Sequence, residues 1–215
     1  EGLLAESAAY SSLQAGPEFA AWRAAHPARQ RDDRARRVRV EREGDLLHIT
    51  LTRAEARNAL DTAMRDQLVD ALLLAAADDS IAQVHLRGEG PSFCAGGDLD
   101  EFGSRPDPAT AHLVRMLQSA GRAIHVVGAR VTAHVHGACR GSGVELPAFA
   151  GRVVATPDAT FGLPEVSLGL IPGAGGTVSV TRRVGRHRTA LLALTGDAVD
   201  TATALEWGLV DEITT

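Results

Sequence analysis

The chain has 215 residues, 45% of them hydrophobic, and a formal net charge of -5, which allows one domain with a real core and gives no general attraction to nucleic acid. All 22 residues counted as Lys or Arg are arginines, which excludes enzymes that need a lysine, such as Schiff-base aldolases, pyridoxal phosphate enzymes and P-loop nucleotidases. No stretch approaches the roughly 18 uninterrupted apolar residues of a membrane span, and no signal-peptide pattern opens the chain, so we expect a soluble, cytoplasmic protein with no membrane partner.

Residues 1–37 are interpreted as an appended, basic and partly helical extension, because they are rich in Ala, Ser, Arg and Gln and lack strand alternation. Between Trp22 and Arg39 there are seven arginines against Asp32 and Asp33. A short basic run without interleaved aromatic residues favours a solvated helix or linker. An arm that engages nucleic acid or an acidic partner is the alternative.

The folded domain, residues 38–215, is expected to open with a hairpin and a helix. Apolar and polar residues alternate on both sides of a turn at 43–45, which predicts two paired strands. Asp61 can cap the helix that follows. The apolar face of this helix consists of Met64, Leu68, Ala71, Leu72 and Ala75.

The rest of the chain alternates between strand and helix patterns, with glycine-rich loops at 88–102 and 137–143. The predicted strands lie at 83–87, 131–136, 153–155, 160–161 and 209–213. One predicted helix spans 110–124, and a second follows the glycine-rich turn at 137–143. Three more are predicted at 175–184, 186–194 and 201–207. This alternation is typical of the mixed α/β class.

Two glycine-containing turns, residues 92–98 and 137–143, each follow a predicted strand. Small residues there can leave backbone N–H groups uncovered. Two such groups that converge would form an oxyanion hole, in which one donor is worth about 3 kcal/mol of barrier. Taken alone, each segment is better explained as a tight turn.

Two glutamates lie in apolar surroundings. Glu145 falls in the apolar stretch 144–150, and Glu165 lies in a corner between apolar segments. Partial burial raises the pKa of a carboxyl group towards the range useful for general acid/base catalysis. Two such groups can share one water molecule, although each alone is also a common helix cap or surface residue.

Other candidate motifs do not support a site. The glycine run at 173–177 lacks the G-x-G-x-x-G spacing of a dinucleotide loop. His134 and His136 face the same side of a strand but have no third ligand at a suitable spacing, so we expect no metal. Cys94 and Cys139 are expected to be buried thiols.

Together, the motifs resemble those of the crotonase (enoyl-CoA hydratase/isomerase) family over about residues 38–213. The segments that carry the resemblance are, in order, 55–60 (EARNAL), 92–99 (SFCAGGDL), 141–146 (GSGVEL), 161–165 (FGLPE), 169–177 (GLIPGAGGT) and 194–196 (LTG). Their ordered succession at the spacing of the family makes chance agreement very improbable. The resemblance implies an α/β fold built as a spiral of ββα units.

The resemblance also implies the chemistry of the site. Two backbone N–H groups stabilise a thioester enolate in this family, and by position they belong here to Ala95 and Ser142. Family hydratases add two glutamates, which correspond to Glu145 and Glu165. A water molecule held between them, with help from the N–H of Gly173, adds to C3 of a 2-enoyl thioester.

The expected ligand is the coenzyme A part of an acyl-CoA substrate, with no prosthetic group. The segment 57–60 lines the coenzyme A groove in the resemblance, with Arg57 a candidate for its phosphates. The expected binding residues are Arg57, Ala59, Leu60, Ala95, Gly96, Gly97 and Asp98. The family also implies a homo-oligomer, a trimer or hexamer.

Enoyl-CoA hydration is the expected activity. Double-bond isomerisation, thioester hydrolysis and decarboxylation use the same oxyanion hole and remain alternatives, as does a non-catalytic module that binds acyl-CoA or a partner.

The chain departs from the family at Ser142, usually a glycine, and at Arg140, usually apolar. It ends at Thr215, before the C-terminal helices that complete the acyl pocket and trimer interface, so we expect little or no C-terminal helical region and either a truncated chain or a different lid. Glu1 in place of a methionine indicates a fragment or a processed start.

Overall fold

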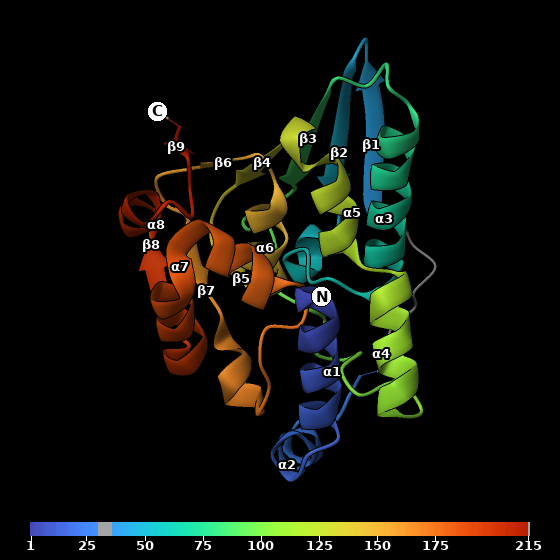
Figure 1. The fold of residues 1–215 in the computed structure, drawn as a ribbon, viewed down its shortest axis with the longest axis vertical. Coiled ribbons are helices and arrows are strands. Elements are labelled where there is room, and N and C mark those ends of the chain that lie inside the picture. Colours follow the sequence, from blue (N-terminus) through green and yellow to red (C-terminus); the bar gives the residue numbers. More distant parts are fainter. Residues whose placement is uncertain (30–35, 215) are drawn as a thin grey trace.

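The computed structural model describes residues 1–29 and 36–214, and within them the strands form two sheets (Figure 1). The larger sheet has the order β1 (Val38–Glu43), β2 (Leu46–Leu51), β3 (Gln83–Gly88), β4 (Val131–Val135), β6 (Arg152–Ala155) and β9 (Glu212–Ile213). The smaller sheet has the order β5 (Ala138–Arg140), β7 (Thr160–Gly162) and β8 (Ala198–Asp200). The helices are α1 (Gly2–Gln14), α2 (Pro17–Ala25), α3 (Thr62–Ala77), α4 (Pro108–Leu117), α5 (Ala120–Val127), α6 (Ser142–Glu145), α7 (Gly176–Thr195) and α8 (Thr201–Trp207).

The larger sheet begins with the predicted hairpin. Strands β1 and β2 pair antiparallel, while β2, β3, β4, β6 and β9 are parallel to their neighbours. Helix α3 packs against β1, β2 and α5. One buried core therefore contains side chains from sheet and helices, including Ile49, Leu72, Leu86 and Ile124. The predicted mixed α/β class is confirmed.

Helix α3 forms as the sequence predicts. The Asp61 side chain accepts a hydrogen bond from the N–H of Met64 at 2.7 Å, which satisfies a donor that has no partner inside the helix. The predicted apolar face is buried at every position, namely Met64, Leu68, Ala71, Leu72 and Ala75.

The helix predicted at 110–124 is two helices. The chain breaks between α4 and α5 because Ser119 caps α5 by accepting the N–H of Arg122 at 3.2 Å. The second glycine-rich turn contains strand β5, which is not predicted, and it leads into the predicted helix, α6, which is only four residues long.

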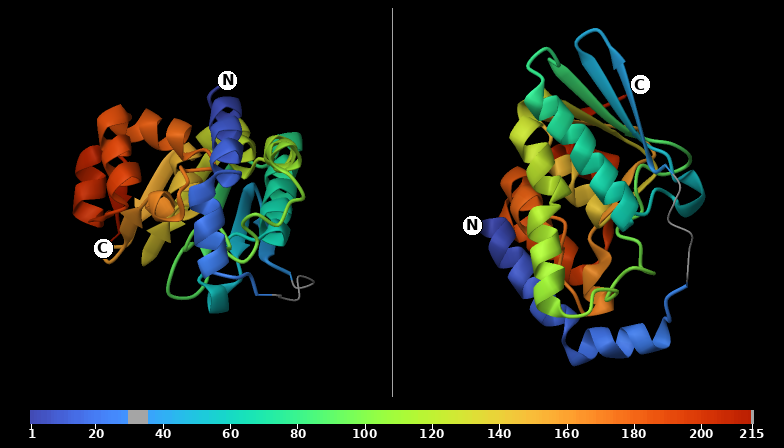
Figure 2. Two further views of the ribbon diagram at one scale, coloured as in Figure 1. Left: turned by 90° about the horizontal axis from the view of Figure 1, so that it is seen from below. Right: turned by 90° about the vertical axis from the view of Figure 1, so that its right-hand side faces the viewer.

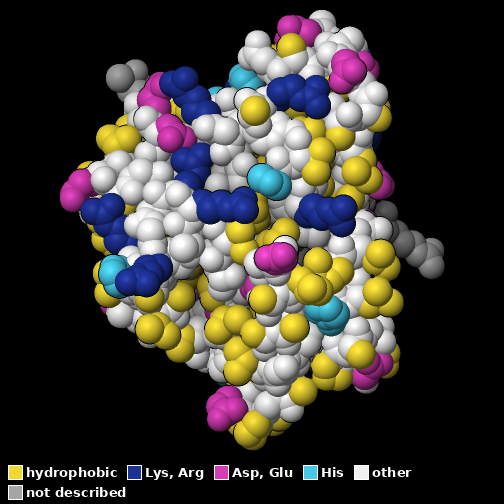
Figure 3. Space-filling model, viewed as in Figure 1, with side chains coloured by type: hydrophobic (Ala, Val, Ile, Leu, Met, Phe, Trp, Pro, Cys, Tyr) yellow, Lys and Arg dark blue, Asp and Glu magenta, His cyan; other side chains and the backbone are white. Residues whose placement is uncertain are grey.

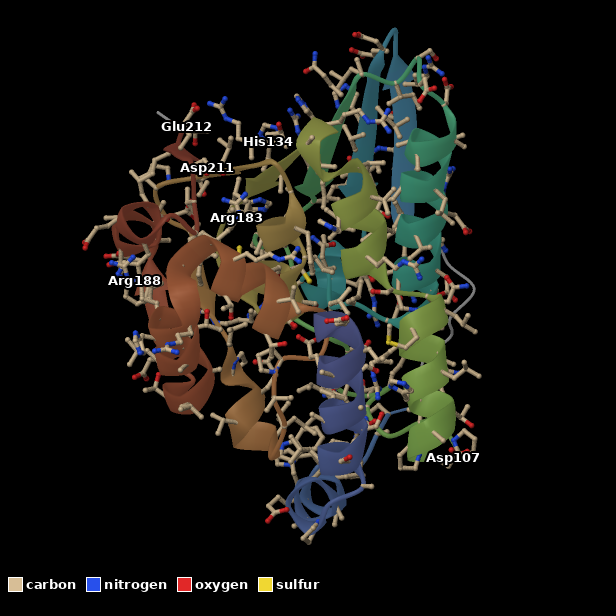
Figure 4. All side chains as sticks on the ribbon, viewed as in Figure 1. Asp107, His134, Arg183, Arg188, Asp211 and Glu212 are labelled. Atoms are coloured by element: carbon tan, nitrogen blue, oxygen red, sulfur yellow. The ribbon has the colours of Figure 1, made fainter. Side chains whose placement is uncertain are left out.

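The pair of helices predicted at 175–184 and 186–194 is confirmed, because α7 contains a non-helical residue, Gly185, with φ 80° and ψ 164°. Strand β8 is not predicted, and the closing strand shrinks to two residues of β9. Arg183 of α7 reaches Asp211 just before β9, with 2.9 Å between Nη1 and Oδ2 (Figure 4). No helix in the described segments is long and apolar enough to cross a bilayer.

Helices α1 and α2 lie against the rest of the protein. Helix α1 lies between α4 and α7 and contacts both (Figures 1 and 2). Its inward side buries Glu6, Ser7, Tyr10 and Ser11, and α2 buries Phe19. The division into an extension, 1–37, and a core, 38–215, stays a prediction.

The expectation that the arginine-rich run is solvated is wrong at two positions. The Arg23 guanidinium donates to the carbonyls of Leu99 and Phe102 at 2.5 and 2.6 Å. Arg37 is only 8% exposed. Two further arginines of the run, Arg31 and Arg34, lie outside the described residues.

A buried ion cluster joins three parts of the chain. Nη1 of Arg53 lies 2.6 Å from Oδ2 of Asp98 and 3.2 Å from Oδ2 of Asp61, and Nε of Arg37 lies 3.0 Å from the same Asp61 oxygen. The side chains of Arg53 and Asp61 are 2% and 1% exposed. The cluster therefore ties the start of α3 to the loop at 94–98.

We expect Asp61→Ala to lower the free energy of unfolding by about 3–5 kcal/mol, because it leaves Arg53 buried with one anion fewer and removes the cap of α3. Asp61→Asn keeps a cap and separates the two effects. Urea titration measures both variants. The control is Asp66→Ala on the same helix, whose pair with Arg65 is more exposed and should be worth less than about 1 kcal/mol. An equal, small loss for Asp61→Ala and the control would contradict the prediction.

Candidate active site

A cavity of about 210 Å³ brings together segments that lie far apart in the sequence. Its walls come from α1, the first turn of α3, the loop at 97–105, α4, α5, α6 and the glycine run 173–175. Ser142, Glu145, Glu165 and Gly173 all line it. The structure therefore unites four of the five predicted catalytic positions around one space.

The turn before α6 leaves a backbone donor uncovered. Gly141 has φ 49°, a conformation that a residue with a Cβ rarely adopts. A Cβ at Gly143 would lie 2.1 Å from the carbonyl oxygen of Cys94, so the chain can approach this loop only with glycine there. Among the described residues, the N–H of Ser142 has no hydrogen-bond partner. This donor lies on the wall of the cavity.

The structure does not support Ala95 as the second donor. The Ala95 N–H donates to the carbonyl oxygen of Arg57 at 2.9 Å, and Ala95 does not line the cavity. Two residues on, Gly97 lines the cavity, and within residues 1–29 and 36–214 its N–H has no partner. The bridge that pairs Leu60 with Gly97 uses the groups on either side of Gly97. The sequence of the turn does not show which N–H is free of partners, because any of several small residues in it could supply a donor.

Glu145 is buried and held from one side. It is 2% exposed, and its Oε2 accepts the N–H groups of Ala174 and Gly176 at 2.7 and 2.8 Å. Burial, and then the nearby charges of Glu165 and Glu6, raise the pKa of Glu145 well above its usual value.

Glu165 is buried with less support. It is 7% exposed, and its Oε2 has no hydrogen-bond partner within the described part of the chain. Its Oε1 faces Gly141, where a Cβ would lie 2.6 Å away. Burial, together with the negative charge of Glu6, raises the pKa of Glu165 to about 7. Glu165 can therefore gain or lose a proton near neutral pH, which suits a general acid or base.

A third glutamate at the site was missed by sequence analysis. Glu6 of α1 is 5% exposed, lines the cavity and accepts hydrogen bonds from Gly175 and Thr177. Burial raises its pKa. The Ala- and Ser-rich sequence of α1 contains no motif that marks Glu6.

The residues expected to bind coenzyme A are divided. Leu60, Gly97 and Asp98 line the cavity, whereas Ala59 and Gly96, like Arg57 and Ala95, do not. The Asp98 carboxylate belongs to the ion cluster with Arg53, so its side chain has a structural role. The side chain of Arg57 is exposed to solvent. Its role towards the phosphates stays a prediction.

The histidines, cysteines and Arg140 singled out in the sequence either lie away from the cavity or are engaged in other contacts. His134 lies on β4, away from α1 (Figure 4), and Nε2 of His136 lies 2.9 Å from the carbonyl oxygen of Gly90. The described residues contain no group of three side chains that could hold a metal. Both cysteines are buried thiols, as predicted. Arg140 turns towards carbonyl oxygens of Cys139 and Thr160.

Comparison with known proteins gives consistent matches. A family model described as enoyl-CoA hydratase/isomerase matches residues 41–215. The 2,3-dehydroadipyl-CoA hydratase of Escherichia coli (strain K12) is 37% identical over 174 residues, which are 81% of this chain and 68% of that protein. A probable enoyl-CoA hydratase of Rhizobium meliloti (strain 1021) is 37% identical over 176 residues, 81% of this chain and 67% of that protein. The crystal structure of an enoyl-CoA hydratase from Thermoplasma volcanium GSS1 has a TM-score of 0.76 and 34% identity, covering 84% of this chain and 72% of that one.

The raised pKa of Glu165 predicts how stability depends on pH. The folded protein holds this proton up to a pH of about 7, whereas the unfolded chain releases it near 4.5, so this group destabilises the fold as pH rises between those values. We expect Glu165→Gln to become more stable relative to wild type by about 2–3 kcal/mol between about pH 4 and pH 8. Urea titrations across this range test it, with the exposed Glu206→Gln as control. A difference from wild type that does not change with pH would refute the prediction.

Proposed function

The chain belongs to the enoyl-CoA hydratase/isomerase family, and on that premise we propose that it adds water across the C2=C3 double bond of a 2-enoyl-CoA thioester. The observation that carries the proposal is the pair Glu145 and Glu165, both buried, both lining one cavity and both with raised pKa values. Hydration needs one group that accepts a proton from water and one that donates a proton to carbon. Two carboxylates repel each other, so near neutral pH one of the pair holds a proton while the other is ionised.

The backbone donors act on the thioester oxygen. In the proposed complex, the N–H groups of Gly97 and Ser142 donate to this oxygen, where negative charge builds up when water adds to C3. Both N–H groups are free of partners within the described residues and both residues line the cavity. Fixed donors of this kind stabilise the enolate-like transition state more than the ground state.

The glutamates move the protons. Glu145, ionised, accepts a proton from the water as its oxygen bonds to C3. Glu165, protonated, delivers a proton to C2 as the π bond breaks. The net addition is one water, and a proton passing from Glu145 to Glu165 through solvent resets the pair. The N–H of Gly173, on the same wall, helps to hold the water between the carboxyls.

The proposal extends to the ligand and the assembly. The coenzyme A part follows the loop that contains Leu60 and Gly97, and no prosthetic group takes part. A homo-oligomer, a trimer or hexamer, is also proposed. Hydrophobic side chains gather in the lower half of the face in Figure 3, and Leu113, Leu117 and Leu194 are 57%, 71% and 74% exposed, which fits an interface. The expected cytoplasmic location stays a prediction.

We expect the protein to consume 2-enoyl-CoA, followed as loss of enoyl-thioester absorbance. Glu145→Gln and Glu165→Gln should each reduce kcat by at least about a hundredfold, because general acid/base catalysis contributes factors of this order. Chromatography of the product should show the 3-hydroxyacyl thioester.

Controls separate this reaction from its alternatives. Glu206→Gln on α8 should retain wild-type activity, and circular dichroism should show both site variants folded. A product with a shifted double bond or free coenzyme A would replace hydration by isomerisation or hydrolysis. No turnover by a folded protein that still binds the thioester would refute the hydratase, and no binding would favour the non-catalytic module.

A further inference from the structure

Two carboxylates share the run of backbone donors at the start of α7. The N–H groups of residues 174–177 are divided in alternation: Glu145 accepts the first and third, and Glu6 accepts the second and fourth, at 2.7–2.8 Å. Glu6 also accepts the hydroxyl of Thr177 at 2.6 Å. The turn is therefore held from both sides, and neither carboxylate alone satisfies these donors.

Helix α1 contacts the same turn a second time, through Tyr10. A Cβ at Gly173 would lie 2.5 Å from the Tyr10 ring, so the ring packs directly against this glycine. Tyr10 is 7% exposed and lines the cavity. Because Glu6 and Tyr10 are one helical turn apart, a single helix face contacts both ends of the turn.

From these contacts we infer that Glu6 is a positioning residue of the catalytic centre, which fixes the 173–177 turn opposite Glu145 and adds a third carboxylate to the pair Glu145 and Glu165. The inference deepens the proposed hydration and rests on it. It gives the N-terminal helix a direct part in the reaction.

The groups around Glu6 do not neutralise its charge, which therefore acts on Glu145 and Glu165. The charge of Glu6 acts on Glu145 of α6 and on Glu165 of the 3-10 helix Pro164–Leu168. The positive charge of Arg115 on α4 partly offsets the effect of burial on the pKa of Glu6.

Arg115 does not form an ion pair with Glu6 among the described residues. Its guanidinium donates instead to the Ser7 and Ser11 hydroxyls and lies over the Tyr10 ring, 4.7 Å from the centroid. His112 of α4 also contacts the Ser7 hydroxyl. The charge of Glu6 is therefore only partly offset at a distance.

The position of Glu6 has two separable effects. Its hydrogen bonds hold the turn that carries Gly173, which a neutral side chain does only in part. Its negative charge makes ionisation of Glu165 harder, which a neutral side chain does not do at all. A residue that only held the turn would have the first effect without the second.

The first experiment follows titration without relying on turnover. In the full chain labelled with ¹³C-carboxyl glutamate, NMR gives the titration midpoint of Glu165, assigned with Glu165→Gln. We expect Glu6→Gln to lower this midpoint by at least about half a pH unit, because a neighbouring negative charge is removed. The matched control is Glu18→Gln on the exposed face of α2, which should leave the midpoint unchanged.

The second experiment uses 2-enoyl-CoA turnover. Glu6→Ala should reduce kcat by about tenfold to a hundredfold through loss of geometry. Glu6→Gln should retain more activity, and its decline at high pH, where Glu165 loses the proton it donates, should begin at lower pH than in wild type. Glu6→Asp should restore the wild-type pH profile more fully than Glu6→Gln.

The outcomes separate the two proposals. An unchanged Glu165 midpoint in folded Glu6→Gln would overturn the role of Glu6, whatever the enzyme catalyses. A shifted midpoint in a protein that does not hydrate 2-enoyl-CoA would uphold the role of Glu6 in this cavity and refute the hydratase. If Glu6→Ala fails to fold, the midpoint and pH profile of Glu6→Gln decide alone.

Discussion

Two carboxylates buried against one glycine-rich turn, with a third carboxylate lining the same cavity, determine the chemistry of this site. Burial of a carboxylate is costly unless backbone donors or cations replace the lost water. Here the N–H groups at the start of α7, at the positive end of the helix dipole, support Glu145 and Glu6. Glu165 receives less support, since its Oε2 has no hydrogen-bond partner within the described residues, and burial with the charge of Glu6 raises its pKa to about 7.

The need of buried carboxylates for backbone donors also explains why the N-terminal helix is part of the site. The family match begins at residue 41, yet α1 supplies Glu6 and Tyr10 to the cavity wall. Helix α1 lies between α4 and α7 (Figure 1), and its residues line the cavity. A segment outside the family match therefore takes part in shaping an active site built from the family motifs.

Local patterns made much of the fold predictable. The hairpin, the Asp61 cap and the break at Gly185 each depend on residues close together in the sequence, and such features follow from spacing and turn chemistry. Glu145 and Glu165 were identifiable because they fall within motifs. Glu6 was not, because its partners at 175 and 177 lie about 170 residues away and its own helix shows no signal. Ala95 is the donor that the family motif implies by position, whereas the N–H that the structure leaves free, that of Gly97, is determined by the pairing with Leu60, a tertiary contact.

The ion cluster of Arg53, Asp61 and Asp98 has a consequence for motion. Asp61 caps α3, and Asp98 immediately follows Gly97, so the loop that carries the proposed donor Gly97 shares this ion cluster with a long core helix. Opening this loop would separate the buried Arg53 guanidinium from Asp98, one of its two anions. The cost in free energy is comparable to losing much of the packing of α3. The loop and α3 are therefore expected to open as one cooperative unit. An enzyme built this way keeps its proposed oxyanion hole formed before substrate arrives.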